Sequence, residues 1–338
     1  SLGELKAQVS LTALWNKRIA IAGLSLSGVR ANLEQNADST FNFEHIINAF
    51  AGNDADPEAV DTTGGWTITA DGISLQDIHY TMVMAPSQLD LDLRLEHLDL
   101  DLKEFDLDRM RFHGGELLVS GTSLRMTSAP RTPTPDTYPE LIPPFPDLHI
   151  DLERAMLTDI RYHMGTVGAG DSLWVALEQG ELEVEQLDLP HQRFHFSRIA
   201  LVEARFGMLR TDTTAADASS DDPPWLDQND GFRYFLRDFD IAADQLRITN
   251  SALAMHAGSI GEGAGPFDPH HVIVEDLDVK VDGIVANNEE VRADIRDLQA
   301  RAVPGASTWK LSAEVMATPA MARMNEVRVA WNDLVMRL

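Results

Sequence analysis

The chain has 338 residues, 44% of them hydrophobic, which is enough to fill the core of one large domain or two ordinary ones. Its 54 acidic and 27 basic residues give a formal charge of -27 without a basic stripe, and this argues against a nucleic-acid partner because phosphate binding needs clustered Lys and Arg. Cysteine is absent, which excludes disulfides, thiolate metal sites and Cys nucleophiles.

The first predicted strand, residues 19–26, alternates apolar and polar residues and then changes phase, because Ile19 and Ile21 are followed by Leu24 and Leu26. The same pattern recurs at residues 93–100, 105–112, 150–157, 182–189, 194–201, 272–279 and 293–300, and with a longer gap at 66–75 and 239–248. Such a phase change needs either a two-residue hairpin turn or one extra residue in a continuous strand, a β-bulge. Where only two residues intervene, the intervening pairs contain no Asn-Gly or Asp-Gly, which tight hairpins favour. We therefore predict bulges that keep one face of a curved sheet apolar.

Helix signals are few, and the best is at residues 42–52. Asn42 can cap a helix, Gly52 can end it, and the residues between them carry an apolar stripe with i, i+3, i+4, i+7 spacing. Two later segments are predicted loops: the Pro-rich residues 129–147 and the acidic residues 211–231. Both are long enough to be mobile, and the acidic composition of the second favours this.

A longer repeat of about 45 residues is superimposed on the strand pattern. SLQDIHYTM (residues 74–82) and MLTDIRYHM (156–164) are near copies, and LVEARFGM and LRITNSALAM are diverged relatives. The expected anchor positions of the repeat are Leu26, Leu75, Phe112, Leu157, Leu201 and Ile248. Repeats that bury a face only by stacking on neighbours form elongated architectures. We predict one mainly β domain over residues 1–338: a repetitive, bulged antiparallel sheet curved into a U-shaped groove, with one or two short helices.

No motif for catalysis or metal binding stands out, so we expect no enzyme, no metal and no cofactor. His191 and His195 are four apart in a strand pattern, where that spacing does not make a helical metal pair. Residues 227–231 lack the fuller ligand set and the distal acid of a calcium loop. A β-helical polysaccharide enzyme is one rival class, and it would need a carboxylate cluster in an open cleft.

Residues 19–50, IAIAGLSLSGVRANLEQNADSTFNFEHIINAF, resemble the opening unit of the AsmA-like family, in particular its TamB-type envelope proteins. There a strand pair of this form leads to an Asn-rich segment and a short helix. The matching residues are Asn36, Asn42, Phe43, Ile46 and Ile47, whereas Ser39 stands where the family usually has Gly.

This resemblance implies a non-enzymatic groove in the bacterial periplasm that carries phospholipids between the inner and outer membranes and supports outer-membrane assembly. It also implies an outer-membrane β-barrel partner and an inner-membrane anchor elsewhere in a longer chain, because these 338 residues contain no leader and no apolar run of 18 residues.

On this hypothesis the functional residues form a surface that offers apolar contact to sliding lipids. The expected lining residues are Leu91, Leu93, Leu95, Leu98, Leu100, Phe105, Leu107, Ile150, Leu152, Phe194, Phe196, Phe239 and Ile241. The alternative is a structural or adhesive β-repeat protein, in which the same face packs into a closed, protein-filled core.

Overall fold

The computed structural model describes residues 3–9, 18–37, 40–42, 67–106, 111–129, 149–167, 171–188, 191–210, 239–257, 271–303, 307–318, 321–332 and 334–337. These residues form one sheet of fifteen strands and contain no helix. The strands are β1 (Glu4–Val9), β2 (Arg18–Gln35), β3 (Thr67–Ala70), β4 (Gly72–Met84), β5 (Leu89–Asp106), β6 (Arg111–Ser128), β7 (His149–Thr166), β8 (Ser172–Asp188), β9 (Arg193–Arg210), β10 (Asp240–Ala257), β11 (His271–Ala286), β12 (Val291–Val303), β13 (Ser307–Thr318), β14 (Met321–Trp331) and β15 (Leu334–Arg337).

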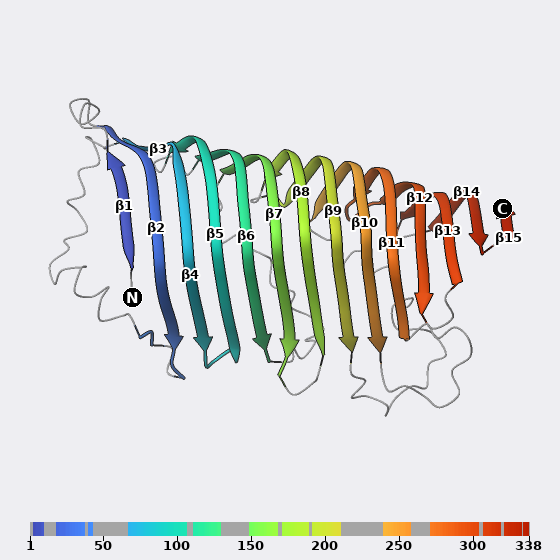
Figure 1. Ribbon diagram of the computed structural model, residues 1–338, viewed down its shortest axis with the longest axis horizontal. Helices are drawn as coiled ribbons and strands as arrows, with labels where there is room; N and C mark the ends of the chain where they lie inside the picture. Colours follow the sequence, from blue (N-terminus) through green and yellow to red (C-terminus); the bar gives the residue numbers. More distant parts are fainter. Residues whose placement is uncertain are drawn as a thin grey trace.

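The strands follow one another across the sheet in chain order, except that β3 pairs with β2 beside β4. Strands make extensive contacts only with their neighbours in this order, apart from β3 with β5. Figure 1 shows the result: a long sheet, not closed into a barrel, whose strands turn over along the upper edge. The predicted mainly β, elongated and curved sheet is therefore confirmed.

The sheet is not antiparallel throughout, and in this respect the prediction was wrong. β4, β7 and β10 run parallel to β2, β6 and β9 respectively, and the short β3 is also parallel to β2. Parallel neighbours need a long crossover connection, whereas a hairpin needs only a few residues. Two of the three connections contain the predicted loops 129–147 and 211–231, which join β6 to β7 and β9 to β10.

These two loops lie outside the described residues, apart from Ala129, and so does the predicted helix at 42–52, apart from Asn42. The described residues therefore show that both loop segments connect parallel strands, while the helix and the predicted mobility of the loops stay predictions.

The phase changes occur inside continuous strands, as predicted, at residues 93–100 in β5, 150–157 in β7 and 272–279 in β11. Residues 105–112 are an exception, because Asp106 pairs with Arg111 and the connection from β5 to β6 lies between them. Residues 66–75 are another, because the strand is interrupted at Asp71 between β3 and β4.

The phase changes of neighbouring strands lie side by side and form a row across the sheet. Six strands that run in the same direction each carry one residue with positive φ in this row: Gly28, Asp77, Gly121, Asp159, Glu203 and Asn250. Left-handed backbone is easiest for Gly, Asn and Asp, which supply five of the six. Each of these residues stands two positions after an apolar one, as Asp77 follows Leu75 and Asp159 follows Leu157. The repeat in the sequence is thus a repeat of this backbone irregularity.

Glu203 is the member of this row least suited to positive φ, and so Glu203→Gly is expected to stabilise the protein. Glu203 has a φ of 53°, a left-handed conformation that is strained for Glu but not for Gly. Removal of this strain outweighs the greater backbone entropy that Gly loses on folding, so the free energy of unfolding should rise by about 0.5–1 kcal/mol. The weak contact from Asn250 Nδ2 to Glu203 Oε1, 3.4 Å in an exposed position, contributes little. The measurement is the urea midpoint at constant m-value.

Ala204→Gly is the matched control, because Ala204 is the next residue and has no positive φ. It is expected to destabilise the protein by about 0.5–1 kcal/mol. Equal destabilisation by both substitutions would show that Glu203 is not strained.

Candidate functional site

The apolar side chains of successive strands stand directly opposite one another in rows that cross the sheet. Residues paired in this way project from the same face. We call one such row the central ladder: Leu5, Leu26, Leu75, Leu98, Val119, Leu157, Gly180, Leu201, Ile248, Val279, Leu298, Leu311, Val329 and Met336. The ladder crosses every strand except β3, and Gly180 is its only member without an apolar side chain.

Three further ladders run parallel to the central ladder. The first is Leu24, Ile73, Leu100, Leu117, Ala155, Leu182, Ile199, Leu246, Val281, Ile295 and Ala313. The second is Ala31, Tyr80, Leu93, Leu124, Tyr162, Val175, Phe206, Leu253 and Val274. The third, the methionine ladder, is Leu33, Met82, Leu91, Met126, Met164, Leu173, Met208, Met255 and Val272. Together the four ladders define the apolar face.

The phase changes keep the ladders on one face. The space beside Gly180 is filled by Leu177 and Leu157, so that a Cβ on Gly180 would lie 2.8 Å from Leu177 Cδ2. Leu177 and Gly180 are three residues apart and would face opposite ways in a regular strand. Because both project toward the same space, the face stays apolar across the irregularity.

A second irregularity, near Gly114, also keeps apolar side chains on this face. A Cβ on Gly114 would lie 2.8 Å from Leu100 Cδ1 and 3.1 Å from Leu152 Cδ1, so these two leucines converge from neighbouring strands. Because Leu100 is a ladder residue, Leu152 lies on the apolar face as well.

The polar side chains of β8 and β9 show which residues of β9 lie on the apolar face. Ser197 Oγ lies 3.4 Å from Glu183 Oε2, and Arg198 Nη1 lies 3.7 Å from Glu183 Oε1. Two consecutive residues thus reach one carboxylate on the polar face, which places the residues on either side of them, Phe196 and Ile199, on the apolar face.

The apolar face is only partly buried. The buried hydrophobic residues all belong to it: Leu95, Leu102, Ala155, Ala243, Val279, Val281, Ala300 and Ala313. Among the residues that the structure describes, no side chain is fully buried, because no second layer covers this face. Among the described residues this face stays partly exposed, and extended exposed apolar areas are typical of binding surfaces.

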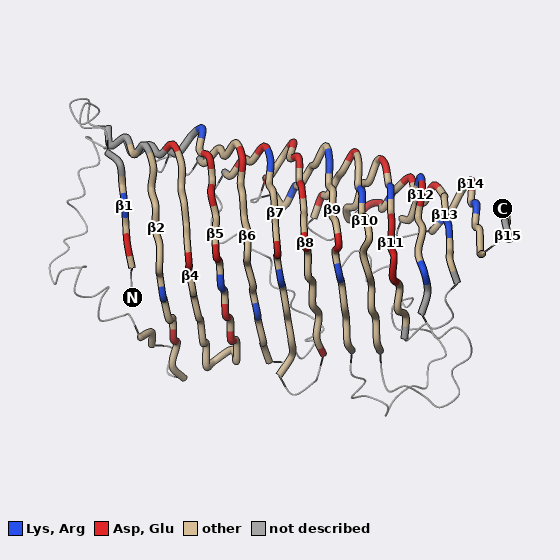
Figure 2. Tube along the Cα trace, viewed as in Figure 1, with Lys and Arg blue, Asp and Glu red and all other residues tan. Residues whose placement is uncertain are grey.

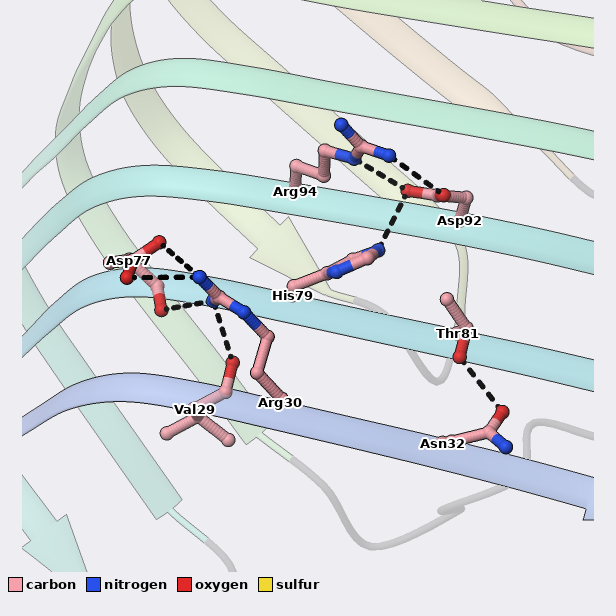
Figure 3. Close-up of polar contacts among 8 residues, drawn as sticks. All are labelled: Val29, Arg30, Asn32, Asp77, His79, Thr81, Asp92 and Arg94. Carbon is pink, nitrogen blue, oxygen red and sulfur yellow. Dashed lines mark hydrogen bonds and ion pairs between the residues drawn. The ribbon is translucent and has the colours of Figure 1, made fainter. Parts of the chain in front are cut away.

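The polar face, on the opposite side of the sheet from the apolar face, carries charged residues that pair with one another (Figure 3), and acidic and basic residues occur along many of the strands (Figure 2). Arg30 Nη2 lies 3.1 Å from Asp77 Oδ1 on the next strand. Arg94 Nε and His79 Nε2 converge on Asp92 Oδ1, at 3.2 and 3.3 Å. Exposed pairs of this kind contribute about 0–1 kcal/mol each, so they keep the polar face solvated without adding much stability.

The Arg94 guanidinium, by its hydrogen bond, holds the pKa of Asp92 below its usual value, against the opposing effect of burial and with a further contribution from His79. The folded-state pKa of Asp92 is therefore below the unfolded value of about 3.9. The stabilisation it contributes is present above that pH and is lost as the pH falls through the folded-state pKa.

Asp92→Asn is accordingly expected to lower the free energy of unfolding at neutral pH by less than about 1 kcal/mol, and the deficit is expected to vanish in strong acid. Urea unfolding of both proteins across this pH range measures it. Asp90→Asn, two residues away on the same face and without an ion pair among the described residues, is the control and should show no such difference. A deficit that did not change with pH would mean that the charge of Asp92 is not its cause.

The structure brings most of the predicted lining residues onto the apolar face. Leu91, Leu93, Leu98 and Leu100 are members of the four ladders, and Leu95 pairs with Ile78 beside them. Ile150 pairs with Phe112, Ile241 pairs with Phe194, and the rings of Phe194 and Phe239 stack at 6.1 Å. Leu152 and Phe196 were placed on this face above. Phe105 is in β5, but its side chain lies outside the described residues, and so does Leu107.

The methionine ladder was not among the predicted lining residues. Five methionines stand in it at equivalent positions: Met82, Met126, Met164, Met208 and Met255. The signal was present, because all four segments quoted for the long repeat end in Met. Methionine is flexible and polarizable, and it adapts to partners of variable shape.

The described residues offer little for metal chemistry. His191 Nδ1 lies 2.9 Å from Asp188 Oδ2. Burial acts to raise the pKa of Asp188, but the hydrogen bonds from His191, together with the charges of His191 and Arg193, outweigh it and lower that pKa. No group of three or more His, Asp or Glu side chains within this part of the chain is placed to hold a metal ion.

No helix in the described ranges is long and apolar enough to cross a membrane. No protein-family model, no curated protein and no solved structure matches the chain.

Proposed function

We propose that this chain is a non-enzymatic conduit for phospholipids, which carries their acyl chains along the apolar face between the inner and outer membranes of a bacterial envelope. The observation that carries the proposal is the continuous apolar face, which crosses the sheet without a second layer among the described residues. Its periplasmic location, its anchor in a longer chain and an outer-membrane β-barrel partner are proposed from the resemblance of residues 19–50 to AsmA-like proteins.

The energetics of lipid transfer favour such a surface. Moving a 14-methylene acyl chain through water costs about 11 kcal/mol, at about 0.8 kcal/mol per CH2. Contact with an apolar face removes most of that barrier. Because the ladder residues, apart from Tyr80 and Tyr162, offer only apolar contact, a chain can slide from one strand to the next with little change in free energy.

The dimensions also fit. Fourteen strands in sequence, at about 4.8 Å each, give the apolar face a length of about 60 Å perpendicular to the strands. One leaflet of acyl chains is about 15 Å thick, half of a hydrocarbon core of about 30 Å. The face is thus long enough for several acyl chains in a row.

The alternative, a structural or adhesive repeat protein with a closed core, requires a second layer over the apolar face. The described residues supply none, and we therefore favour the conduit. The same experiment separates the two functions.

The test is native mass spectrometry, with organic extraction, of the protein purified from bacterial cytosol. If the chain is a conduit, phospholipid should co-purify with it. Extraction releases this lipid, and its mass identifies the headgroup. A lipid-free, tightly folded protein would favour the closed structural repeat instead.

Methionine methyl NMR locates the bound lipid. On addition of a short-chain phospholipid, the methyl signals of Met82, Met126, Met164, Met208 and Met255 are expected to shift. Met156 is an internal control, because it adjoins Leu157 and therefore projects from the polar face, where it is 40% exposed. Shifts at Met156 without shifts in the methionine ladder would place the lipid on the wrong face.

A further inference from the structure

The polar face contains a basic hollow in an otherwise acidic protein. It spans β5 to β8 and has a volume of about 450 Å³. Three arginines line it, Arg94, Arg125 and Arg161, against the single carboxylate of Asp92. The whole chain has two acidic residues for each basic one, so this local excess of positive charge is a distinct feature. We call it the arginine hollow.

Strand register explains how the hollow forms. Arg94 and Arg161 each pair with Ser123, from opposite sides, so a small residue lies between two long ones. One row further along the strands, His163 pairs with Arg125 on one side and with Trp174 on the other. Ser123 forms the floor, and the larger side chains form the walls.

Trp174 forms the aromatic wall, and its position depends on Gly207. The two residues pair across β8 and β9, and a Cβ on Gly207 would overlap the indole. The ring thus occupies the space that the glycine leaves, and it remains 38% exposed. An exposed Trp beside arginines presents a flat apolar ring whose negative face attracts C–H groups and cations.

The arginines are available to a ligand. Arg94 and Arg161 make ion pairs with Asp92 and Asp159 at 3.2 and 3.1 Å, but more than half of each arginine side chain is exposed. Ion pairs in such positions are weak and readily exchanged. Arg125 has no ion-pair partner within the described part of the chain.

We propose that the arginine hollow binds a short stretch of a carboxylated glycan. The guanidinium groups match carboxylates through paired hydrogen bonds, and Trp174 can stack on the C–H face of a sugar ring. The open shape across four strands suits a segment of a polymer. The Ser123 hydroxyl on the floor can bind a sugar hydroxyl.

This site is separate from the apolar face, and the inference does not rest on the proposed lipid function. Arg94 stands between Leu93 and Leu95, whose side chains project to the other side of the sheet. The headgroup of a lipid on the apolar face therefore does not reach the hollow.

The test is isothermal titration calorimetry of the whole chain at low ionic strength, with oligogalacturonate as the probe. Neutral maltohexaose and poly-glutamate of matched charge are the comparison ligands. Only oligogalacturonate is expected to bind well, and its affinity should fall as salt is added. No detectable binding of oligogalacturonate would overturn the proposal.

Variants separate the site from general charge effects. Arg125→Gln with Arg161→Gln is expected to weaken binding at least about tenfold, a loss of about 1.4 kcal/mol. Trp174→Ala should weaken it severalfold, and Ser123→Glu, which leaves the walls intact and adds a negative charge, should weaken it likewise. Arg247→Gln, on the same face but outside the hollow, should leave it unchanged. Equal binding of poly-glutamate, or no effect of both Trp174→Ala and Ser123→Glu, would overturn the assignment to a glycan.

Discussion

Two Asp substitutions in the central ladder, Leu157→Asp with Leu201→Asp, are expected to remove bound phospholipid from the purified protein. A carboxylate facing hydrocarbon costs about 2.5–3.5 kcal/mol even where the surroundings can adjust. Because about 1.4 kcal/mol changes an equilibrium constant tenfold, each substitution should lower lipid occupancy about a hundredfold at that position. Native mass spectrometry with extraction measures the ratio of lipid to protein.

The matched control places the same two charges on the opposite face. Thr158 and Ala200 each adjoin a ladder residue in the same strands, β7 and β9, and therefore face the other way. Thr158→Asp with Ala200→Asp should keep the lipid of the unmodified protein. Circular dichroism checks that both double variants retain the sheet, which is expected because no second layer packs on either position among the described residues.

Equal lipid content in the two double variants would contradict the proposed function. The ladders would then be a structural surface, and any lipid would be bound elsewhere on the chain. A lipid-free protein with the ladder charges and a lipid-loaded protein with the control charges would instead locate the cargo on the central ladder.

The apolar face could be predicted from the sequence because its signal is local. Alternation with period two assigns Leu91, Leu93 and Leu95 to one face, and a bulge restores Leu98 and Leu100 to it. These inferences need only the residues of one strand.

Alignment between distant strands could not be predicted as well. Of the six expected anchors, five lie in the central ladder, but Phe112 pairs with Ile150, and Val119 takes the place assigned to it. The error arose because the turn between β5 and β6 has the same apolar spacing as a bulge. The arginine hollow was missed for a related reason: Arg94, Arg125 and Arg161 are isolated in the sequence and come together only through register.

Strand direction was the other feature that the sequence did not reveal. Alternation reads the same in both directions, so it gives no information on whether neighbours are parallel or antiparallel. The information lies in the lengths of the connections, since a parallel pair needs a crossover of a dozen or more residues. The Pro-rich loop 129–147 has the length of such a crossover, and this length is the signal in the sequence for parallel β6 and β7.

Because parallel neighbours need a long connection and antiparallel neighbours do not, shortening one loop should have a large effect and shortening another a small one. Replacing residues 130–148 by a four-residue turn is expected to abolish the parallel pairing of β6 with β7, because the end of β6 would no longer reach the start of β7. A short link favours an antiparallel hairpin instead, and this would reverse every later strand. Hydrogen exchange should show that the sixteen register pairs between these strands lose their protection.

Replacing residues 258–270 by the same four-residue turn is the control. That segment joins β10 to β11, which are antiparallel neighbours whose adjoining ends pair at His256 and His271. A hairpin of this length suits such a pair, and its shorter loop costs slightly less entropy to close, so the protection of β10 and β11 should be retained. If the deletion at 130–148 also left protection intact, β6 and β7 would have to be antiparallel, and the crossover would be wrong. Loss of protection from the first deletion alone would show that the long Pro-rich segment is needed for its length, because it sets the direction of β7.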